Sequence, residues 1–186
     1  MKRLFVFILL VCFSQPGTAG EIDWERASFG VTANYQIPVG DLGTYWGNSA
    51  AAGGFTRYKV MDRVYLMGTI TVSYFTPADD TGDKSIPHIW LVNISGSIHY
   101  EIPFSSRLKA LMGIGGDNFT FIFRGTPAGH LGPNYIESEV ALHGEVGLSF
   151  QFPGIPRFDL STRYSSIFSY PDQIPIWMSG IYVYLW

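Results

Sequence analysis

The chain has 186 residues, of which 47% are hydrophobic, 16% aromatic and only 15% charged. Soluble domains usually carry about 25% charged residues, so this chain is poor in charge for an ordinary soluble domain. The formal net charge of −3, with no basic patch, argues against binding to nucleic acid. Outside the N-terminus, no apolar run reaches the roughly 18 residues that a transmembrane helix needs.

Residues 1–20 have the pattern of a secretory signal peptide. A positively charged start precedes an apolar core at 4–13, and small residues lead to an expected cleavage site after Ala19 or Gly20. The apolar core is too short to span a bilayer as an anchor. We therefore expect the protein to cross the inner membrane and to lose this segment.

The lone cysteine, Cys12, lies inside the expected signal peptide. A lipoprotein is disfavoured because Val11 is bulkier than the small residue that such signals prefer at this position. Loss of Lys2 and Arg3 with the signal leaves 10 basic residues against 15 acidic ones, a net charge near −5. The mature chain, expected to be one domain at 21–186, would then contain no thiol and no disulfide.

Three strands are expected between residues 28 and 75, because apolar and polar residues alternate there with a period of two. In the segment 28–37, Phe29 and Val31 share one face and polar side chains share the other. Segments 49–60 and 63–75 repeat this alternation on either side of a tight turn at 61–62.

The segment 90–102 has the clearest alternation and predicts a fourth strand. Trp90 and Ile94 lie on its apolar face, whereas His99 and Glu101 lie on its polar face. Ordinary strands have about 5–6 residues, whereas strands that cross a bilayer at a tilt need about 9–11. The length of this segment therefore favours a strand whose apolar face meets lipid.

Four more strands are expected, at about 107–123, 135–152, 157–166 and 177–186, which makes eight in all. The connections alternate in length. Long ones are predicted at 38–48, 76–87, 124–134 and 167–176, and short ones at 61–62, 103–106 and 153–156. An even number of strands, joined alternately by short turns and longer loops, is the plan of small bacterial outer-membrane barrels.

The two faces of these strands predict which side of the barrel meets lipid. A soluble, lipocalin-like barrel could use the same alternation inverted, but aromatic residues near the strand ends are typical of membrane interfaces. The expected lipid-facing band includes Trp90, Val92, Ile94, Ile98, Val140, Leu142, Val146 and Leu148. The expected interior charge network consists of Arg57, Lys59, Arg63, His99, Glu101, Arg107, Lys109, Glu137, Glu139, His143, Glu145, Asp159 and Arg163.

The last strand carries the most specific motif, in which alternate residues Met178, Gly180, Tyr182, Tyr184 and Trp186 end in an aromatic side chain. With the signal peptide, the strand count and the loop alternation, it resembles the OmpA/OmpX-type family of eight-stranded outer-membrane barrels. In that family such a motif is the C-terminal assembly signal, here Tyr182, Tyr184 and Trp186, although it usually ends in Phe. The opposite face of the strand is also apolar, so its orientation stays open.

The resemblance implies an all-β, antiparallel up-and-down transmembrane barrel in the outer membrane of the Gram-negative cell envelope. Its implied partners are outer-membrane lipid, lipopolysaccharide and the barrel assembly machinery, and we expect a monomer that needs no cofactor. The expected function is structural or one of surface contact, with the paired interior charges acting as a plug. A narrow diffusion pore is the first alternative, but eight strands leave a lumen that side chains can fill.

The second alternative is an enzyme that modifies lipid A. The family's deacylases place a histidine and a serine two residues apart on the lipid-facing side. Here His143 lies on a polar face with Glu145 two residues on, and no histidine precedes Ser165 in that pattern. A metal site formed by His88 and the loop acids Asp79, Asp80 and Asp83 is disfavoured because their spacing fits no EF-hand. We therefore expect no catalytic, cofactor or metal site.

Overall fold

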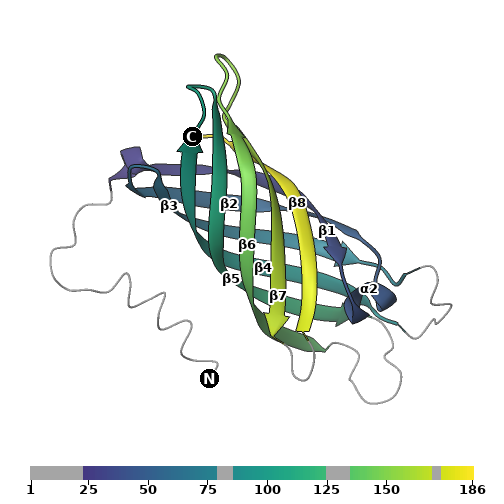
Figure 1. The fold of residues 1–186 in the computed structure, drawn as a ribbon. Helices are drawn as coiled ribbons and strands as arrows, with labels where there is room; N and C mark the ends of the chain where they lie inside the picture. Colours follow the sequence, from purple (N-terminus) through teal and green to yellow (C-terminus); the bar gives the residue numbers. More distant parts are fainter. Residues whose placement is uncertain (1–22, 79–85, 125–134, 169–172) are drawn as a thin grey trace, which may run out of the picture.

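The computed structural model describes residues 23–78, 86–124, 135–168 and 173–186; the expected signal peptide lies outside these ranges and stays a prediction. Eight strands follow one another around a closed barrel, and β1 pairs with β8 to complete it (Figure 1). All the pairings are antiparallel, so the expected fold class is confirmed. The strands are β1 (Ala27–Pro38), β2 (Ser49–Met61), β3 (Val64–Phe75), β4 (His88–Pro103), β5 (Leu108–Arg124), β6 (Ile136–Phe150), β7 (Phe158–Phe168) and β8 (Gln173–Tyr184).

The barrel has two unlike ends, which Figure 1 shows at its lower right and upper left. We call the end that holds residues 39–48 and 76–78 the loop end, and the end that holds 62–63 and 104–107 the turn end. A short helix, α2 (Asp41–Tyr45), lies at the loop end within the segment expected to be a plain loop. At the turn end the one-turn helix η1 (Trp24–Arg26) precedes β1. No helix among the described residues is long and apolar enough to span a membrane.

The connection between β7 and β8 is shorter than the loop predicted at 167–176. β7 continues to Phe168 and β8 begins at Gln173, so that Ile167 pairs with Ile174 in a continued ladder. The predicted loop is therefore too long at both ends, and Pro175 lies within β8. Proline is tolerated where a strand lacks a second neighbour, and β1 pairs with β8 only as far as Ile176. The predicted alternation of connection lengths also fails here, since 151–157 is longer than 169–172.

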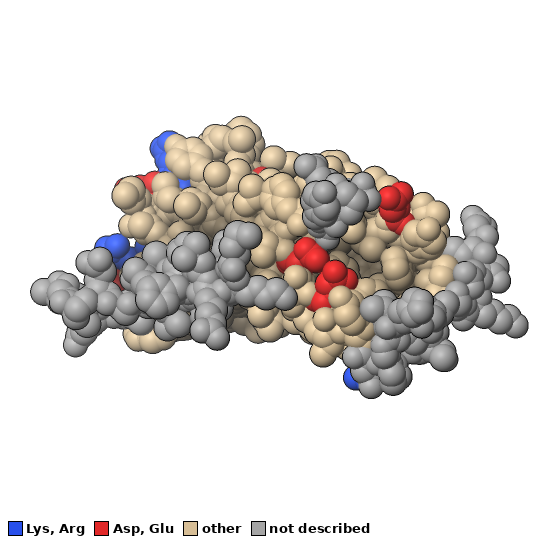
Figure 2. Space-filling model, turned by 90° about the horizontal axis from the view of Figure 1, so that it is seen from below, with Lys and Arg blue, Asp and Glu red and all other residues tan. Residues whose placement is uncertain are grey.

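The outward face of the strands is mostly apolar along the whole barrel. All members of the expected lipid-facing band point outward, and Ile94, Ile98 and Ile114 expose 54%, 53% and 71% of their surface. Within the described strands, Arg124, at the loop end of β5, is the one Asp, Glu, Lys or Arg residue at an outward position. Figure 2 shows one side of this surface, where lysine and arginine are visible only towards the ends.

The inward face divides the lumen into a polar and an apolar part. From the turn end to the middle of the barrel, the inward side chains are mostly charged or hydroxyl-bearing. At the loop end a buried apolar cluster replaces them, which we call the apolar plug. Its members are Leu42, Phe75, Ile89, Leu91, Phe119, Phe121, Ala141, Ile167, Ile176 and Met178.

Candidate functional site: the charged lumen

Glu101, on β4, is the centre of a charge cluster near the turn end. Its carboxylate accepts hydrogen bonds from Arg57 Nη2 and Lys109 Nζ, each at 2.8 Å, and from the Tyr65 hydroxyl at 3.2 Å. Arg157 Nη2 donates a further bond to it. Because Glu101 is only 2% exposed, these donors replace the water that would otherwise solvate its charge.

Asp159, on β7, joins the same turn-end cluster. It accepts a hydrogen bond from the Tyr184 hydroxyl and ion-pairs with Arg57 and Arg157, each at 3.4 Å. The two guanidinium groups also lie over aromatic rings, Arg57 at 3.8 Å from the Tyr65 centroid and Arg157 at 4.5 Å from that of Tyr184. Such cation–π contacts add stabilisation to desolvated arginines, so the cluster is held by both carboxylates and rings.

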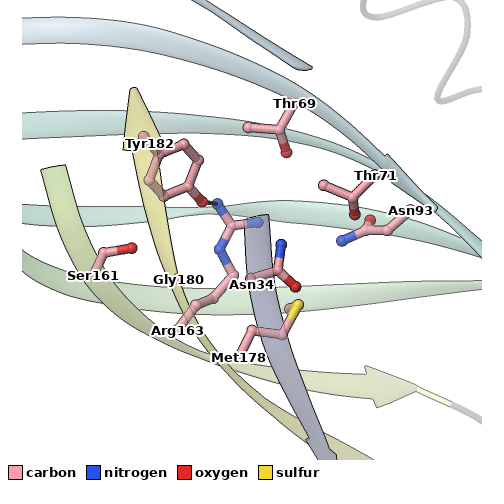
Figure 3. Close-up of a pocket in the computed structure, with 9 residues that line it drawn as sticks. All are labelled: Asn34, Thr69, Thr71, Asn93, Ser161, Arg163, Met178, Gly180 and Tyr182. Carbon is pink, nitrogen blue, oxygen red and sulfur yellow. Dashed lines mark hydrogen bonds between the residues drawn. The ribbon is translucent and has the colours of Figure 1, made fainter. Parts of the chain in front are cut away.

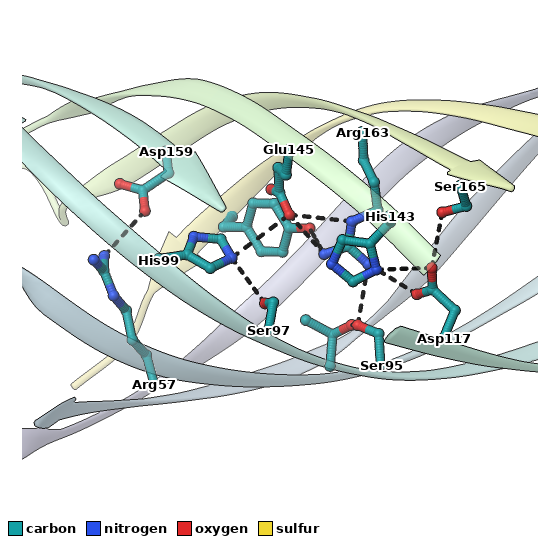
Figure 4. Close-up of polar contacts among 12 residues, drawn as sticks. Arg57, Ser95, Ser97, His99, Asp117, His143, Glu145, Asp159, Arg163 and Ser165 are labelled. Atoms are coloured by element: carbon teal, nitrogen blue, oxygen red, sulfur yellow. Dashed lines mark hydrogen bonds and ion pairs between the residues drawn. The ribbon is translucent and has the colours of Figure 1, made fainter. Parts of the chain in front are cut away.

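Arg163, on β7, is the centre of a second charge cluster, in the middle of the barrel (Figure 4). Its Nη2 and Nε donate to one oxygen of Glu145 at 2.7 and 3.1 Å, and its Nη1 donates to Asp117 at 3.2 Å. Nη1 also donates to the Ser95 hydroxyl at 3.0 Å, and Nη2 to that of Tyr182 at 3.4 Å. The acceptors of these five bonds lie on four strands, so the Arg163 side chain links opposite walls of the lumen.

Both interior histidines belong to this middle cluster. His143 Nδ1 lies 2.8 Å from Asp117 Oδ2, which also accepts the Ser165 hydroxyl at 2.8 Å. His99 Nε2 lies 2.8 Å from the Ser97 hydroxyl. A serine hydrolase needs a hydroxyl on one nitrogen of a histidine base and an acid that orients the ring from the other nitrogen. Ser165 donates to the acid instead, and Ser97 and Glu145 both lie on the same His99 nitrogen, Nε2, with Glu145 3.7 Å from it. The arrangement is that of a buried hydrogen-bond network.

The charges of the two clusters balance. With both histidines counted as neutral, four cations face four carboxylates, and every one of the eight makes at least one ion pair. They are Arg57, Lys109, Arg157 and Arg163 against Glu101, Asp117, Glu145 and Asp159. A buried ion pair is tolerated only when its desolvation is offset by close partners, and this balance meets that condition.

Five residues of the expected interior network lie outside these two clusters. Lys59 pairs with Asp62 at 2.8 Å at the edge of the turn end, and its hydrogen bond lowers the pKa of the Asp62 carboxyl. Arg63 and Arg107 are exposed in turns, Arg63 with a φ of 73°. The half-buried Glu137 and Glu139 lie towards the loop end, paired in register with Phe121 and Phe119.

The structure adds two charges that the sequence prediction left out, Asp117 and Arg157. Asp117 lies two residues beyond Gly115 on the same face of β5 as Lys109, so the alternation could have found it if followed through the glycines at 113–116. Arg157 precedes β7 and lay at the boundary of the predicted strand. Among the residues described, no group of three His, Cys, Asp or Glu side chains could hold a metal ion.

No protein-family model and no curated protein sequence matches this chain, but its fold resembles several solved structures. Neisserial surface protein A matches with a TM-score of 0.61 at 14% identity, over 84% of this chain and 96% of its own. The outer membrane protein OprG from Pseudomonas aeruginosa matches with 0.53 at 11% identity, over 85% and 91%. Ail, the attachment invasion locus protein of Yersinia pestis, matches with 0.51 at 13% identity, over 86% and 97%. This chain has the fold of the small outer-membrane β-barrels.

In this outer-membrane barrel fold, alternate residues of the C-terminal segment face the lumen and the outside. Tyr182 and Tyr184 point into the lumen and are each 7% exposed, whereas Ile181 and Leu185 point outward. Trp186 lies beyond the end of β8, exposed, and stacks on Phe29 with their ring centroids 6.4 Å apart. The orientation that the sequence left open is therefore fixed: the tyrosines belong to the lumen.

Proposed function

We propose that the protein crosses the bacterial outer membrane with its eight strands and has a structural or surface-contact role. The outward face carries this proposal, because soluble monomers rarely expose apolar patches above a few hundred Å². Aromatic side chains lie at both ends of the apolar band, with Tyr74 and Trp90 in contact at the loop end and Phe29 and Trp186 at the turn end. Such girdles mark the two lipid–water interfaces of membrane barrels.

We propose further that the lumen is a plug and not a channel. The balanced charges support this role because each is bonded to an opposite charge across the lumen. The apolar plug supports it independently, because an apolar constriction excludes water and therefore ions. Phe119, Ile167 and Ile176 within that plug are fully buried.

A non-catalytic role is supported by the burial of the histidines. His99 and His143 are 2% and 5% exposed, and neither reaches the lipid-facing side where a lipid substrate would lie. The three similar structures named above do not carry the name of an enzyme. The partners in this proposal are outer-membrane lipid, lipopolysaccharide and the barrel assembly machinery.

Membrane fractionation of a Gram-negative host that expresses the full chain tests the location. We expect the protein in the outer-membrane fraction, with a gel mobility that changes on heating because the folded barrel resists detergent. Recovery as a dissolved monomer in buffer without detergent would reverse the proposed orientation of the two faces. Planar-bilayer recording of the purified protein tests the plug: we expect no conductance steps, and reproducible steps would favour the diffusion pore.

A further inference from the structure

We infer that the lumen binds one ordered water molecule between Asn34 on β1 and Asn93 on β4. A cavity lies there, between the middle charge cluster and the apolar plug (Figure 3). The space open to the centre of a water molecule is about 10 Å³, which is the room that one water needs. The cavity is lined by Asn34, Thr69, Thr71, Asn93, Ser161, Arg163, Met178, Gly180 and Tyr182.

Two buried oxygen atoms at this cavity have no hydrogen-bond partner, Asn93 Oδ1 and Asn34 Oδ1. The orientation of the Asn93 amide is fixed by its other atom, since Nδ2 donates to Asp117 Oδ1 at 3.3 Å. The flipped amide would place its oxygen against a carboxylate. Asn93 is only 2% exposed, so bulk solvent cannot satisfy this acceptor, and buried acceptors in proteins are nearly always satisfied.

Water fits these partners because it can donate two hydrogen bonds and also accept. It would donate to Asn34 Oδ1 and Asn93 Oδ1 and accept from the hydroxyl of Thr71, which also lines the cavity. A sodium or potassium ion would find oxygen ligands here, but it would also meet the positive charge of Arg163 within the same lining. The lining therefore favours a neutral molecule.

The bound water would join strands that the ladder does not join. β1 and β4 are separated around the barrel by β2 and β3, and Asn34 and Asn93 line the same cavity from these two strands. Gly180 of β8 makes room for this, because a Cβ there would lie 2.6 Å from Asn34 Cβ. The water would extend the hydrogen bonds of Asp117 to β1 just below the apolar plug. The site depends on the lumen alone and not on what surrounds the barrel.

NMR of the folded full-length mature protein in detergent micelles tests this site. We expect cross-relaxation between water and the side-chain amide protons of Asn34 and Asn93, with the sign of a bound water and not of chemical exchange. In Asn93→Leu, which removes one acceptor and fills its space, the Asn34 signal should disappear. Asn118→Leu on the outward face is the matched control and should leave both signals unchanged.

Two results would overturn the inference. The first is an absence of water contacts at both amides in a spectrum that detects other bound waters, because the cavity would then be dry. The second is a shift of both amides when choline replaces sodium and potassium, because the occupant would then be a cation. If Asn93→Leu does not fold, Asn34→Leu takes its place with the Asn93 amide as the probe, and the spectrum of the unaltered protein still decides.

Discussion

Replacement of Arg163 by methionine should strongly destabilise the barrel. Among the described residues, Arg163 is the one lysine or arginine that contacts Glu145 and Asp117, and the side chains of these acids are 2% and 0% exposed. Removal of one partner from a buried ion pair costs about 3–5 kcal/mol, because the other charge stays buried without compensation. Since about 1.4 kcal/mol is a factor of ten, the folding equilibrium constant should fall by roughly 10² to 10⁴.

Urea unfolding in lipid vesicles, followed by gel mobility and tryptophan fluorescence, measures this loss. The triple variant Arg163→Met with Glu145→Gln and Asp117→Asn should recover most of it, because no unpaired charge then remains in the lumen. Lys59→Ala is the matched control, since its ion pair with Asp62 lies at the surface and should leave the unfolding midpoint unchanged. The reasoning would be refuted if Arg163→Met unfolded like Lys59→Ala, or if the triple variant were no more stable than the single one.

Three further changes test the two faces of the barrel and its packing. Ile94→Arg should cost about 2–4 kcal/mol in vesicles and Val60→Arg, near the turn end, about 0–1; equal costs in urea unfolding would contradict the lipid-facing band. Gly30→Val should abolish folding, measured as loss of the heat-modifiable band on a gel, because a Cβ at this position would lie 2.1 Å from Val183 O. Gly96→Ala is the control and should fold normally, because a Cβ at Gly96 would meet nothing within 4 Å. Phe119→Ala should lower the free energy of unfolding by about 3–5 kcal/mol and raise the conductance in planar bilayers. A variant with unchanged stability and no conductance would contradict the proposed role of the apolar plug.

The period of two predicted the strands and their faces because it is a local property of the backbone. It gives the face of each residue but not its depth along the barrel. For that reason it grouped Lys59, Arg63 and Arg107 with the interior charges, although these residues lie at the turn end. Depth depends on the register between strands, such as Arg57 against Met67 on β3, which the sequence alone does not display.

The apolar plug could not be predicted because the alternation fails where both faces are apolar. In β5 the run Phe119-Thr-Phe-Ile-Phe123 has phenylalanine at each inward position and Ile122 outward. The hydropathy pattern of this segment therefore does not indicate which of its side chains face the lumen. The plug also draws Leu42 from α2, and a contact between a loop and the lumen depends on how the closed barrel places that loop.

The aromatic residues near the C-terminus connect the closure of the barrel with its polar lumen. Phe55 of β2 packs edge-on against Tyr182 and Tyr184 of β8, with centroids 5.4 and 4.9 Å apart, and such pairs contribute about 0.5–1.5 kcal/mol beyond their burial. The intervening strand β1 permits these contacts because Gly30 has no side chain to displace the Phe55 ring. The Tyr184 hydroxyl then donates to Asp159 and accepts from Arg57. If β8 were not seated against β1, Arg57 and Asp159 would lose a shared partner, so closure of the seam and assembly of the turn-end charge cluster must be coupled.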